Sequence, residues 1–201
     1  MSERYFTRAR ILSALEALGD ELTREGVRGQ IFIVGGAAMA LAYSTRRVTK
    51  DIDAVFEPKN AIYMAAAKIA KDLGLPDDWL NDAVKGFTPG ADEHARPVPE
   101  IHGLEVTTAS ARYLLAMKLM AMRFGEDEQD IEILLRECGV RSAQEALDLF
   151  THVYPQAGAA AEDAVLSRAA PRICLDVTSD YSSQGIPGPS MPKYPIFRAR
   201  Q

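Results

Sequence analysis

The stretch that decides the fold is residues 31–58, which read IFIVGGAAMALAYSTRRVTKDIDAVFEP. It opens with an apolar, β-branched run that predicts a buried strand over 30–34. The pair Gly35-Gly36 ends that strand, and the Ala-rich residues 37–43 predict a short helix. A basic loop then leads into a second predicted strand at 51–56. The order strand, helix, strand indicates a fold that combines α and β structure.

Outward from this stretch, the predicted elements are mainly helical. Apolar residues at helical spacing predict helices at 8–25, 60–73, 76–83, 111–124, 127–138, 142 onward and 157–169, and a third strand is expected at 103–107. The fold class is therefore α+β: a small mixed β-sheet flanked by helices, with a helical C-terminal half. We expect a core with an N-terminal helix at 1–109, a helical part at 110–178, and an irregular tail rich in Ser, Gly and Pro at 179–201.

The composition restricts the classes of function. The chain has 201 residues, a net charge of −5 and 47% hydrophobic residues, as expected of one domain with a small extension. No apolar run reaches the roughly 18 residues of a membrane span, and the N-terminus lacks a signal pattern, so we expect a cytoplasmic protein without a membrane partner. An acidic chain is not a general nucleic-acid binder. The scattered cysteines and histidines argue against a zinc site or a disulfide framework.

Two aspartates on the second predicted strand are the first candidates for a site. Side chains alternate along a strand, so Asp51 and Asp53 point to one face and Ile52 to the other. Two close carboxylates repel each other, and Mg²⁺, which prefers oxygen ligands, would relieve that repulsion. The alternative is a solvent-facing strand end where both acids are hydrated. Glu105 on the third predicted strand is either a third metal ligand or an ordinary exposed residue.

Glycines and buried charge supply the next candidates. Gly35 and Gly36, between a strand and a helix, let a backbone approach a phosphate, or form an ordinary tight turn. Lys118 lies in a helix that is apolar on nearly every side, so it needs a partner or must reach the surface. Asp130 follows after a break at a glycine, and two helices joined there would bring it to Lys118. Asp127 in the same acidic run is the other candidate, although acids in a first helical turn also complement the helix dipole.

Together these residues resemble a known pattern. The run at 31–58 is similar to the core motif of the polymerase-β-type nucleotidyltransferase superfamily: a strand, Gly-Gly or Gly-Ser, a helix, and an acidic pair on the next strand. The run YLLAMKLMAMRFGEDEQDIEILL, residues 113–135, resembles the AbiEii and MenT-like toxin branch, in which a helical lysine and a following aspartate complete the site. The segment DDWLND at 77–82 is also similar to small members of this branch. Gly36 stands where the Gly-Ser version carries serine, so one hydroxyl contact to phosphate is missing.

The resemblance implies a nucleotidyltransferase-like fold and the metal-dependent transfer of a nucleoside monophosphate from an NTP to an acceptor. The roles it implies are that Asp51 and Asp53 bind Mg²⁺, Gly35 and Gly36 cradle the phosphates, Lys118 neutralises phosphate charge, and Asp130 orients Lys118 or acts as a base. From these roles we expect Asp53→Ala to abolish transfer, and Lys118→Ala to lower the rate with little loss of stability.

The resemblance also implies partners. Several members of the branch are toxins of toxin–antitoxin pairs, and some add nucleotides to the 3′ end of tRNA, so tRNA and a cognate antitoxin are expected partners here. The local cluster Arg46, Arg47 and Lys50 is the candidate that guides an RNA end. Two alternatives stay open: the same chemistry on a small molecule, as in antibiotic-modifying relatives, and an inactive domain that serves in binding or regulation.

Overall fold

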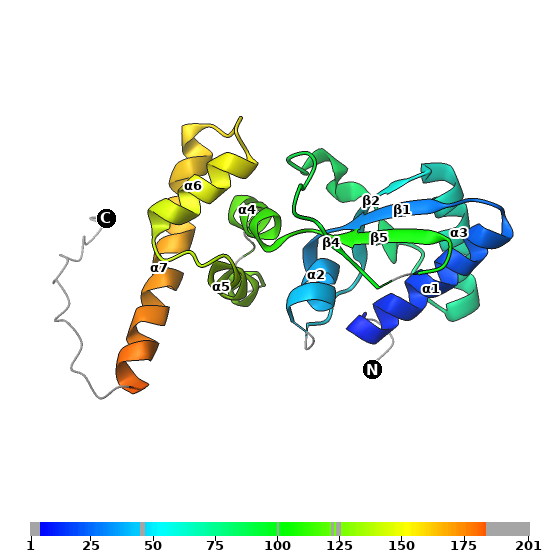
Figure 1. The fold of residues 1–201 in the computed structure, drawn as a ribbon, viewed down its shortest axis with the longest axis horizontal. Coiled ribbons are helices and arrows are strands. Elements are labelled where there is room, and N and C mark those ends of the chain that lie inside the picture. The colour runs from blue at the N-terminus through cyan, green and yellow to red at the C-terminus, as the bar shows by residue number, and fades with distance from the viewer. Residues whose placement is uncertain (1–4, 45–46, 100, 122, 124–125, 184–201) are drawn as a thin grey trace, which may run out of the picture.

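The computed structural model describes residues 5–44, 47–99, 101–121, 123 and 126–183, with residues 174–183 described by their backbone alone. It confirms the α+β fold, with a mixed sheet and a helical C-terminal half (Figure 1). Across these residues, no helix has both the length and the apolar character needed to cross a membrane.

Five strands form one sheet in the described part of the chain, where the sequence predicts three. They are β1 (Gly29–Ile33), β2 (Ile52–Glu57), β3 (Leu80–Asn81), β4 (Arg96–Pro97) and β5 (Leu104–Thr108), in the order β3-β2-β1-β5-β4. Strand β1 is antiparallel to β2 and parallel to β5. The carboxyl ends of β1 and β5 and the beginning of β2 therefore meet at one edge of the sheet, which is where the candidate site lies.

One face of the sheet is covered by α1 (Arg8–Arg24) and α3 (Lys59–Leu73). Leu22 of α1 and Ile62 of α3 approach Gly29 so closely that a Cβ on Gly29 would lie within 3.3 Å of both side chains. Along β2, buried residues alternate with more exposed ones, and Asp53 belongs to the more exposed set. Asp53 therefore lies on the face that these helices leave uncovered.

After β1 the chain forms a helix, as predicted, but the helix changes geometry after one turn. The α-helical segment α2 (Gly35–Ala38) continues as a π-helix, η1 (Met39–Tyr43). The Tyr43 hydroxyl donates to the carbonyl of Ala109 at 3.0 Å, which fixes the end of η1 beside the end of β5.

The predicted helix at 76–83 is wrong. The segment forms a turn, strand β3 and a short 3₁₀-helix, η2 (Ala83–Gly86). The fully buried ring of Trp79 donates from Nε1 to the carbonyl of Ala66 at 3.1 Å, and the Trp79 carbonyl accepts from the backbone N–H of Ile52 at 2.7 Å. These tertiary contacts place the segment beside β2 as the outer strand of the sheet and override its local helical pattern.

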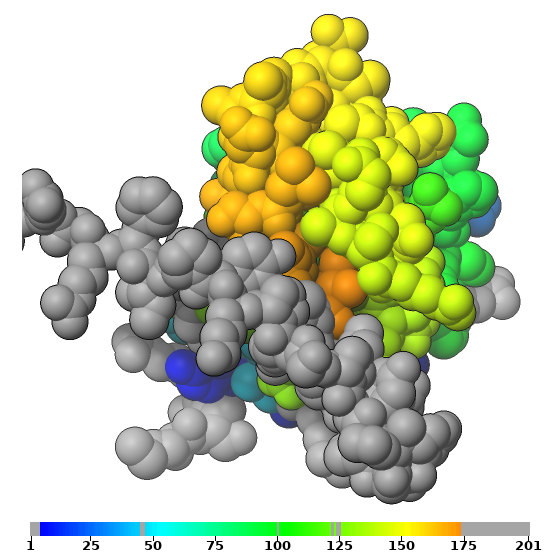
Figure 2. Space-filling view, turned by 90° about the vertical axis from the view of Figure 1, so that its left-hand side faces the viewer, coloured from blue at the N-terminus to red at the C-terminus, as the bar shows by residue number. Residues whose placement is uncertain are grey.

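Four helices make the C-terminal half of the described chain: α4 (Ala111–Ala121), α5 (Glu128–Glu137), α6 (Ala143–Val153) and α7 (Ala159–Ser183). Figure 2 shows α6 (yellow) and α7 (orange) side by side on one face of the molecule. The capping box predicted at Ser142 is present, since the Ser142 hydroxyl accepts from the backbone N–H of Glu145 at 3.1 Å.

Helix α7 is longer than predicted. It continues through Pro171 to Ser183, so residues 179–183 are helical instead of irregular; the rest of the predicted tail, 184–201, lies outside the described residues. Arg168 donates to the carbonyl of Met120 at 2.7 Å, and Arg172 pairs with Glu128 at 3.7 Å. These contacts attach α7 to α4 and α5 on both sides of Pro171.

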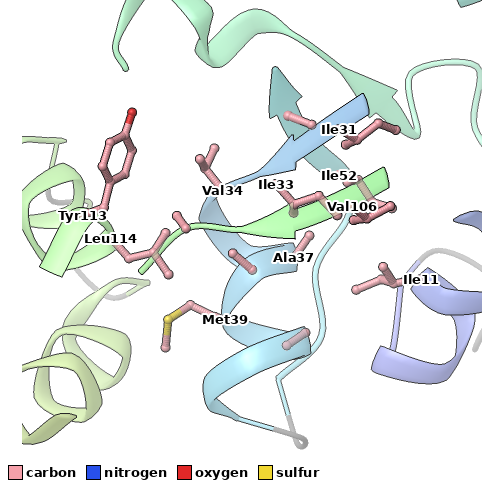
Figure 3. Packing of buried hydrophobic residues seen from close by; sticks show 14 of the residues in the cluster. Ile11, Ile31, Ile33, Val34, Ala37, Met39, Ile52, Val106, Tyr113 and Leu114 are labelled. Carbon is pink, nitrogen blue, oxygen red and sulfur yellow. The ribbon is translucent and has the colours of Figure 1, made fainter. Parts of the chain in front are cut away.

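The sheet and the helical half share one hydrophobic core. Figure 3 shows Leu114 of α4 beside Val34 at the end of β1 and Met39 of η1. All three are essentially excluded from solvent. The junction near residue 110 is therefore a continuous packed interface, and α4 has a fixed position relative to the edge of the sheet where β2 begins.

Candidate active site

The two aspartates lie where β2 begins. Strand β2 starts at Ile52, so Asp51 directly precedes the strand and Asp53 is its second residue; both are half-buried. Burial and, second, the neighbouring charge of Asp53 raise the pKa of Asp51. Asn81 of β3 partly offsets these effects by donating to Asp51 Oδ2 at 3.4 Å.

Gly35 lies against one of these carboxylates. Its φ angle is +61°, and a Cβ on Gly35 would stand 3.1 Å from Asp53 Oδ2. The neighbouring backbone is fixed by a hydrogen bond from Val34 N to the carbonyl of Asp53 at 2.9 Å. Glycine is required here both by the left-handed backbone and by the close approach of the carboxylate.

Gly36 has a different neighbour. A Cβ on Gly36 would lie 2.6 Å from the hydroxyl oxygen of Thr49, closer than real Cβ contacts come. The absence of a side chain at position 36 therefore has a packing reason in this chain, because a serine there would collide with Thr49.

Lys118 is buried and paired with both candidate acids. Its Nζ lies 2.6 Å from Asp127 Oδ1 and 2.8 Å from Asp130 Oδ2, and the two carboxylate side chains are each 3% exposed. Burial raises the pKa of Asp127, but hydrogen bonds from Lys118 and from the backbone N–H of Arg123 outweigh it and lower that pKa. Asp127 stands at the N-cap position of α5 without capping it by its side chain, because the carboxylate turns to these partners.

The basic loop before β2 is only partly placed. Arg47 pairs with Asp130 at 3.3 Å, and its side chain is 30% exposed. Lys50 is exposed, and Arg46 lies outside the described residues. Arg47 thus joins the Lys118 cluster from a second direction, a contact that its predicted role in guiding an acceptor does not require.

A pocket of about 310 Å³ is lined by several of the candidate residues where β2 begins. Gly35, Asp53, Lys118, Asp127 and Arg123 are among its lining residues. The remaining lining residues are apolar and come from β1, α4 and the segment around η2: Val34, Ala83, Val84, Phe87, Leu114, Met117 and Ala121. The pocket therefore has a charged part, where three elements meet, and an apolar part beside it.

Glu105 does not belong to this site, which corrects the expectation of a third metal ligand. The parallel register pairs Glu105 with Gln30, whereas Val34 is the residue bonded to Asp53. Four residues along a strand span about 13 Å, so Glu105 is too far from Asp53 to share an ion with it. Its carboxylate instead accepts from the Gln30 side chain at 3.0 Å. Within the described ranges, no three His, Cys, Asp or Glu residues converge as a metal site.

Several residues of the site were not identified from the sequence. Asn81 was missed because a two-residue strand leaves no periodic pattern, and Phe87 lies in a segment that reads as an ordinary loop. Arg123 left one signal, since with Lys118 it is one of the two charges in the apolar run at 113–123. Nothing in the sequence indicated that Thr49 fills the space beside Gly36.

Comparison with known proteins gives the family. No curated protein matches the chain. Residues 10–147, more than half of the chain, match the model of a family described as "Nucleotidyltransferase of unknown function (DUF6036)". The matched range includes the acidic pair, the two glycines and the Lys118 cluster. The chain therefore belongs to this nucleotidyltransferase family.

Proposed function

We propose that this protein transfers a nucleoside monophosphate from an NTP to a hydroxyl group of an acceptor. The observation that carries the proposal is the single pocket lined by Gly35, Asp53, Lys118 and Asp127. Nucleotidyl transfer needs a place for a polyphosphate, carboxylates that hold a divalent cation, and a fixed positive charge. Membership in a nucleotidyltransferase family supports the same chemistry.

Asp51 and Asp53 fit a magnesium ion. Burial and then the charge of Asp53 raise the pKa of Asp51, and a bound cation would offset both effects. Two carboxylates are a sufficient protein contribution, because Mg²⁺ commonly takes its other ligands from water and substrate phosphates. The bound ion would supply charge neutralisation for the triphosphate. Gly35 would contribute a close backbone approach beside Asp53.

Lys118 is suited to hold one position throughout the reaction. Its ammonium group has three N–H donors; Asp127 accepts one and Asp130 lies 2.8 Å away, which leaves a donor for a phosphate oxygen in the pocket. Asp130 faces both Lys118 and Arg47, which supports an orienting role for Asp130 over a role as base. Such a preformed cluster costs little reorganisation when negative charge develops on the phosphate.

For the acceptor, we propose an RNA 3′ end, that of tRNA first, and with it the role of a toxin that has a cognate antitoxin. The support is the resemblance of residues 113–135 to the AbiEii and MenT-like branch, together with exposed Lys50 next to the acidic pair. Arg47 contributes less to binding an RNA end than its position in the sequence indicates, because its charge is paired with Asp130.

A small cationic acceptor is the second candidate, and one observation favours it. A hollow of about 300 Å³ lies on the open face of the sheet and is lined by Phe32, Val55, Glu57, Glu105 and their neighbours. Val55 is two residues from Asp53 on the same strand, so the two side chains lie on the same face of the sheet. The two carboxylates of the hollow would repel an RNA backbone and attract a cationic hydroxyl compound.

Label transfer tests the function and separates the acceptors. The protein is incubated with Mg²⁺, each α-labelled NTP in turn, and either total RNA or a panel of aminoglycosides. We expect label in tRNA-sized bands for the wild type, and a loss of about 100-fold or more for Asp53→Ala. Asp72→Ala is the matched control, because it removes an exposed carboxylate of α3 that lines neither the pocket nor the hollow. Label on aminoglycosides alone would move the acceptor to the second candidate.

Failure of transfer has its own interpretation. If the wild type labels neither class of acceptor and calorimetry detects no binding of Mg–NTP, the protein is an inactive nucleotidyltransferase-like domain with a binding or regulatory role. Full activity of Asp53→Ala would refute the assignment of the site.

A further inference from the structure

Phe87 is the most exposed of the large hydrophobic side chains that the structure describes, at 74%. A single exposed apolar residue needs no special explanation in a folded protein. Phe87 differs from the others because it lines the same pocket as Asp53 and Lys118. The next most exposed, Met64 at 69%, lies on α3 and does not line this pocket.

Both backbone polar groups of Phe87 make hydrogen bonds. The Phe87 N–H donates to the carbonyl of Val84 at 2.8 Å, and the Phe87 carbonyl accepts from the hydroxyl of Tyr154 at 2.9 Å. Burial raises the pKa of Tyr154 to about 12, so this hydroxyl stays protonated and remains a donor at neutral pH. The segment after η2 is thus attached to the end of α6, and the ring is held at the pocket without being packed into the core.

The pocket separates its polar and apolar surfaces. Asp53, Lys118 and Asp127 supply charge, whereas Val84, Phe87 and Met117 of α4 supply apolar surface. A nucleotide has the same division, since its phosphates carry the charge and its base presents two flat apolar faces. With the phosphates at Lys118, the base of the same molecule is left with the apolar part of the pocket.

We propose that the ring of Phe87 stacks on the nucleobase of the incoming NTP. Because the assignment rests on the proposed nucleotidyl transfer, the base is that of the donor nucleotide. Stacking on an aromatic ring tolerates any base, since every base has a π-face. Phe87 therefore contributes affinity for all four NTPs and little discrimination among them. The anchored backbone lowers the entropy lost when the base binds.

The test compares ligands with and without a base. Isothermal titration calorimetry measures the Kd of each Mg–NTP and of Mg–tripolyphosphate, which carries the phosphates alone. We expect Phe87→Ala to weaken NTP binding by about 5- to 150-fold and to leave tripolyphosphate binding unchanged. Phe87→Tyr should retain NTP binding, because the stacking surface is kept, whereas Phe87→Leu should not. Met64→Ala is the matched control for removing an exposed apolar side chain.

Three results would overturn the assignment, and they separate it from the proposed function. Unchanged NTP binding by Phe87→Ala refutes the stacking role while leaving nucleotidyl transfer in place. Equal weakening of NTP and tripolyphosphate binding shows that the variant damages the pocket as a whole, and also refutes it. Wild-type protein that binds neither ligand refutes the proposed function and the stacking role together. Thermal unfolding confirms that each variant is folded, which the exposure of the Phe87 ring leads us to expect.

Discussion

Replacement of Lys118 by methionine should destabilise the protein strongly, because it leaves two buried carboxylates without their shared cation. Asp127 and Asp130 lie 2.6 and 2.8 Å from the Lys118 ammonium group and are each 3% exposed. Removal of one partner from a buried ion pair typically costs about 3–5 kcal/mol. Asp130 would keep Arg47 at 3.3 Å, and Asp127 would keep the backbone N–H of Arg123 at 2.9 Å. These remaining partners keep the loss near that range, even though two acids are affected.

Urea unfolding followed by circular dichroism measures the effect. With a slope of about 2 kcal/mol per M, a loss of about 3–5 kcal/mol lowers the unfolding midpoint of Lys118→Met by about 1.5–2.5 M at pH 7. Lys71→Met, which changes an exposed lysine of α3, is the control and should move the midpoint by less than about 0.3 M. A midpoint loss below about 0.5 M for Lys118→Met would refute a tightly coupled buried cluster.

The pH dependence gives a second check on the same variant. In the wild type the pKa of Asp127 is lowered, so its contribution is present above the pKa of the unfolded chain and is lost as the pH falls through the folded value. Without Lys118 the pKa of the buried acid rises, and protonation relieves the unpaired charge. The gap between variant and wild type should therefore narrow between pH 7 and pH 5. A gap that stays constant would show that lost packing of the lysine stem, and not charge, causes the destabilisation.

Three further changes test other contacts. Gly36→Ala should cost about 1–3 kcal/mol in urea unfolding, because the new Cβ would stand 2.6 Å from the Thr49 hydroxyl, and Thr49→Ala should restore most of that loss. Asp51→Asn should raise the unfolding temperature at pH 7: the pKa of Asp51 is raised in the folded state, so its ionisation destabilises the fold as the pH rises, and the gain should shrink in acid. Ser142→Ala should cost about 1 kcal/mol in urea unfolding, through loss of the cap of α6.

Each of these three has a contrary outcome. Additive effects of the changes at 36 and 49 would show that the two residues do not collide. A pH-independent gain from Asp51→Asn would show that the ionisation of Asp51 is not its source. An unchanged midpoint for Ser142→Ala would mean that the cap adds nothing to the packing of α6.

The sequence predicted the elements whose apolar pattern repeats over many residues. It missed the elements that depend on tertiary contacts. The helices at 8–24 and 59–73 match predicted spans within a residue, since their apolar faces repeat over several turns. Strands β3 and β4 have two residues each and leave no period to read. Trp79 lies in a segment with a helical pattern, yet burial of its ring places that segment at the edge of the sheet.

The candidate site shows the same division. The alternation rule predicted that Asp51 and Asp53 share a face. In the structure Asp53 lies on the more exposed face of β2 and Asp51 directly precedes the strand. Burial of Lys118 was readable from its apolar helix, but its second acid was not, because that contact depends on the turn between α4 and α5. The buried cluster therefore predicts a loss of stability for Lys118→Ala, where the sequence alone predicted little loss. For Glu105 the sequence left two alternatives open, because strand register cannot be read from a single strand; the register favours the ordinary exposed residue.

The core that joins the sheet to α4 also limits how this family can change. Leu114 packs where Val34 and Met39 meet, and Lys118 is one helical turn further along the same face of α4. A helical half taken from a relative would have to match two features at once: the packing of Leu114 against Val34 and Met39, and the charged cluster at Lys118. The rotation of α4 about its axis would have to agree to within a fraction of a turn. New acceptor preferences should therefore arise through the surface loops around the pocket, which can vary without disturbing this packing, and seldom through recombination near residue 110.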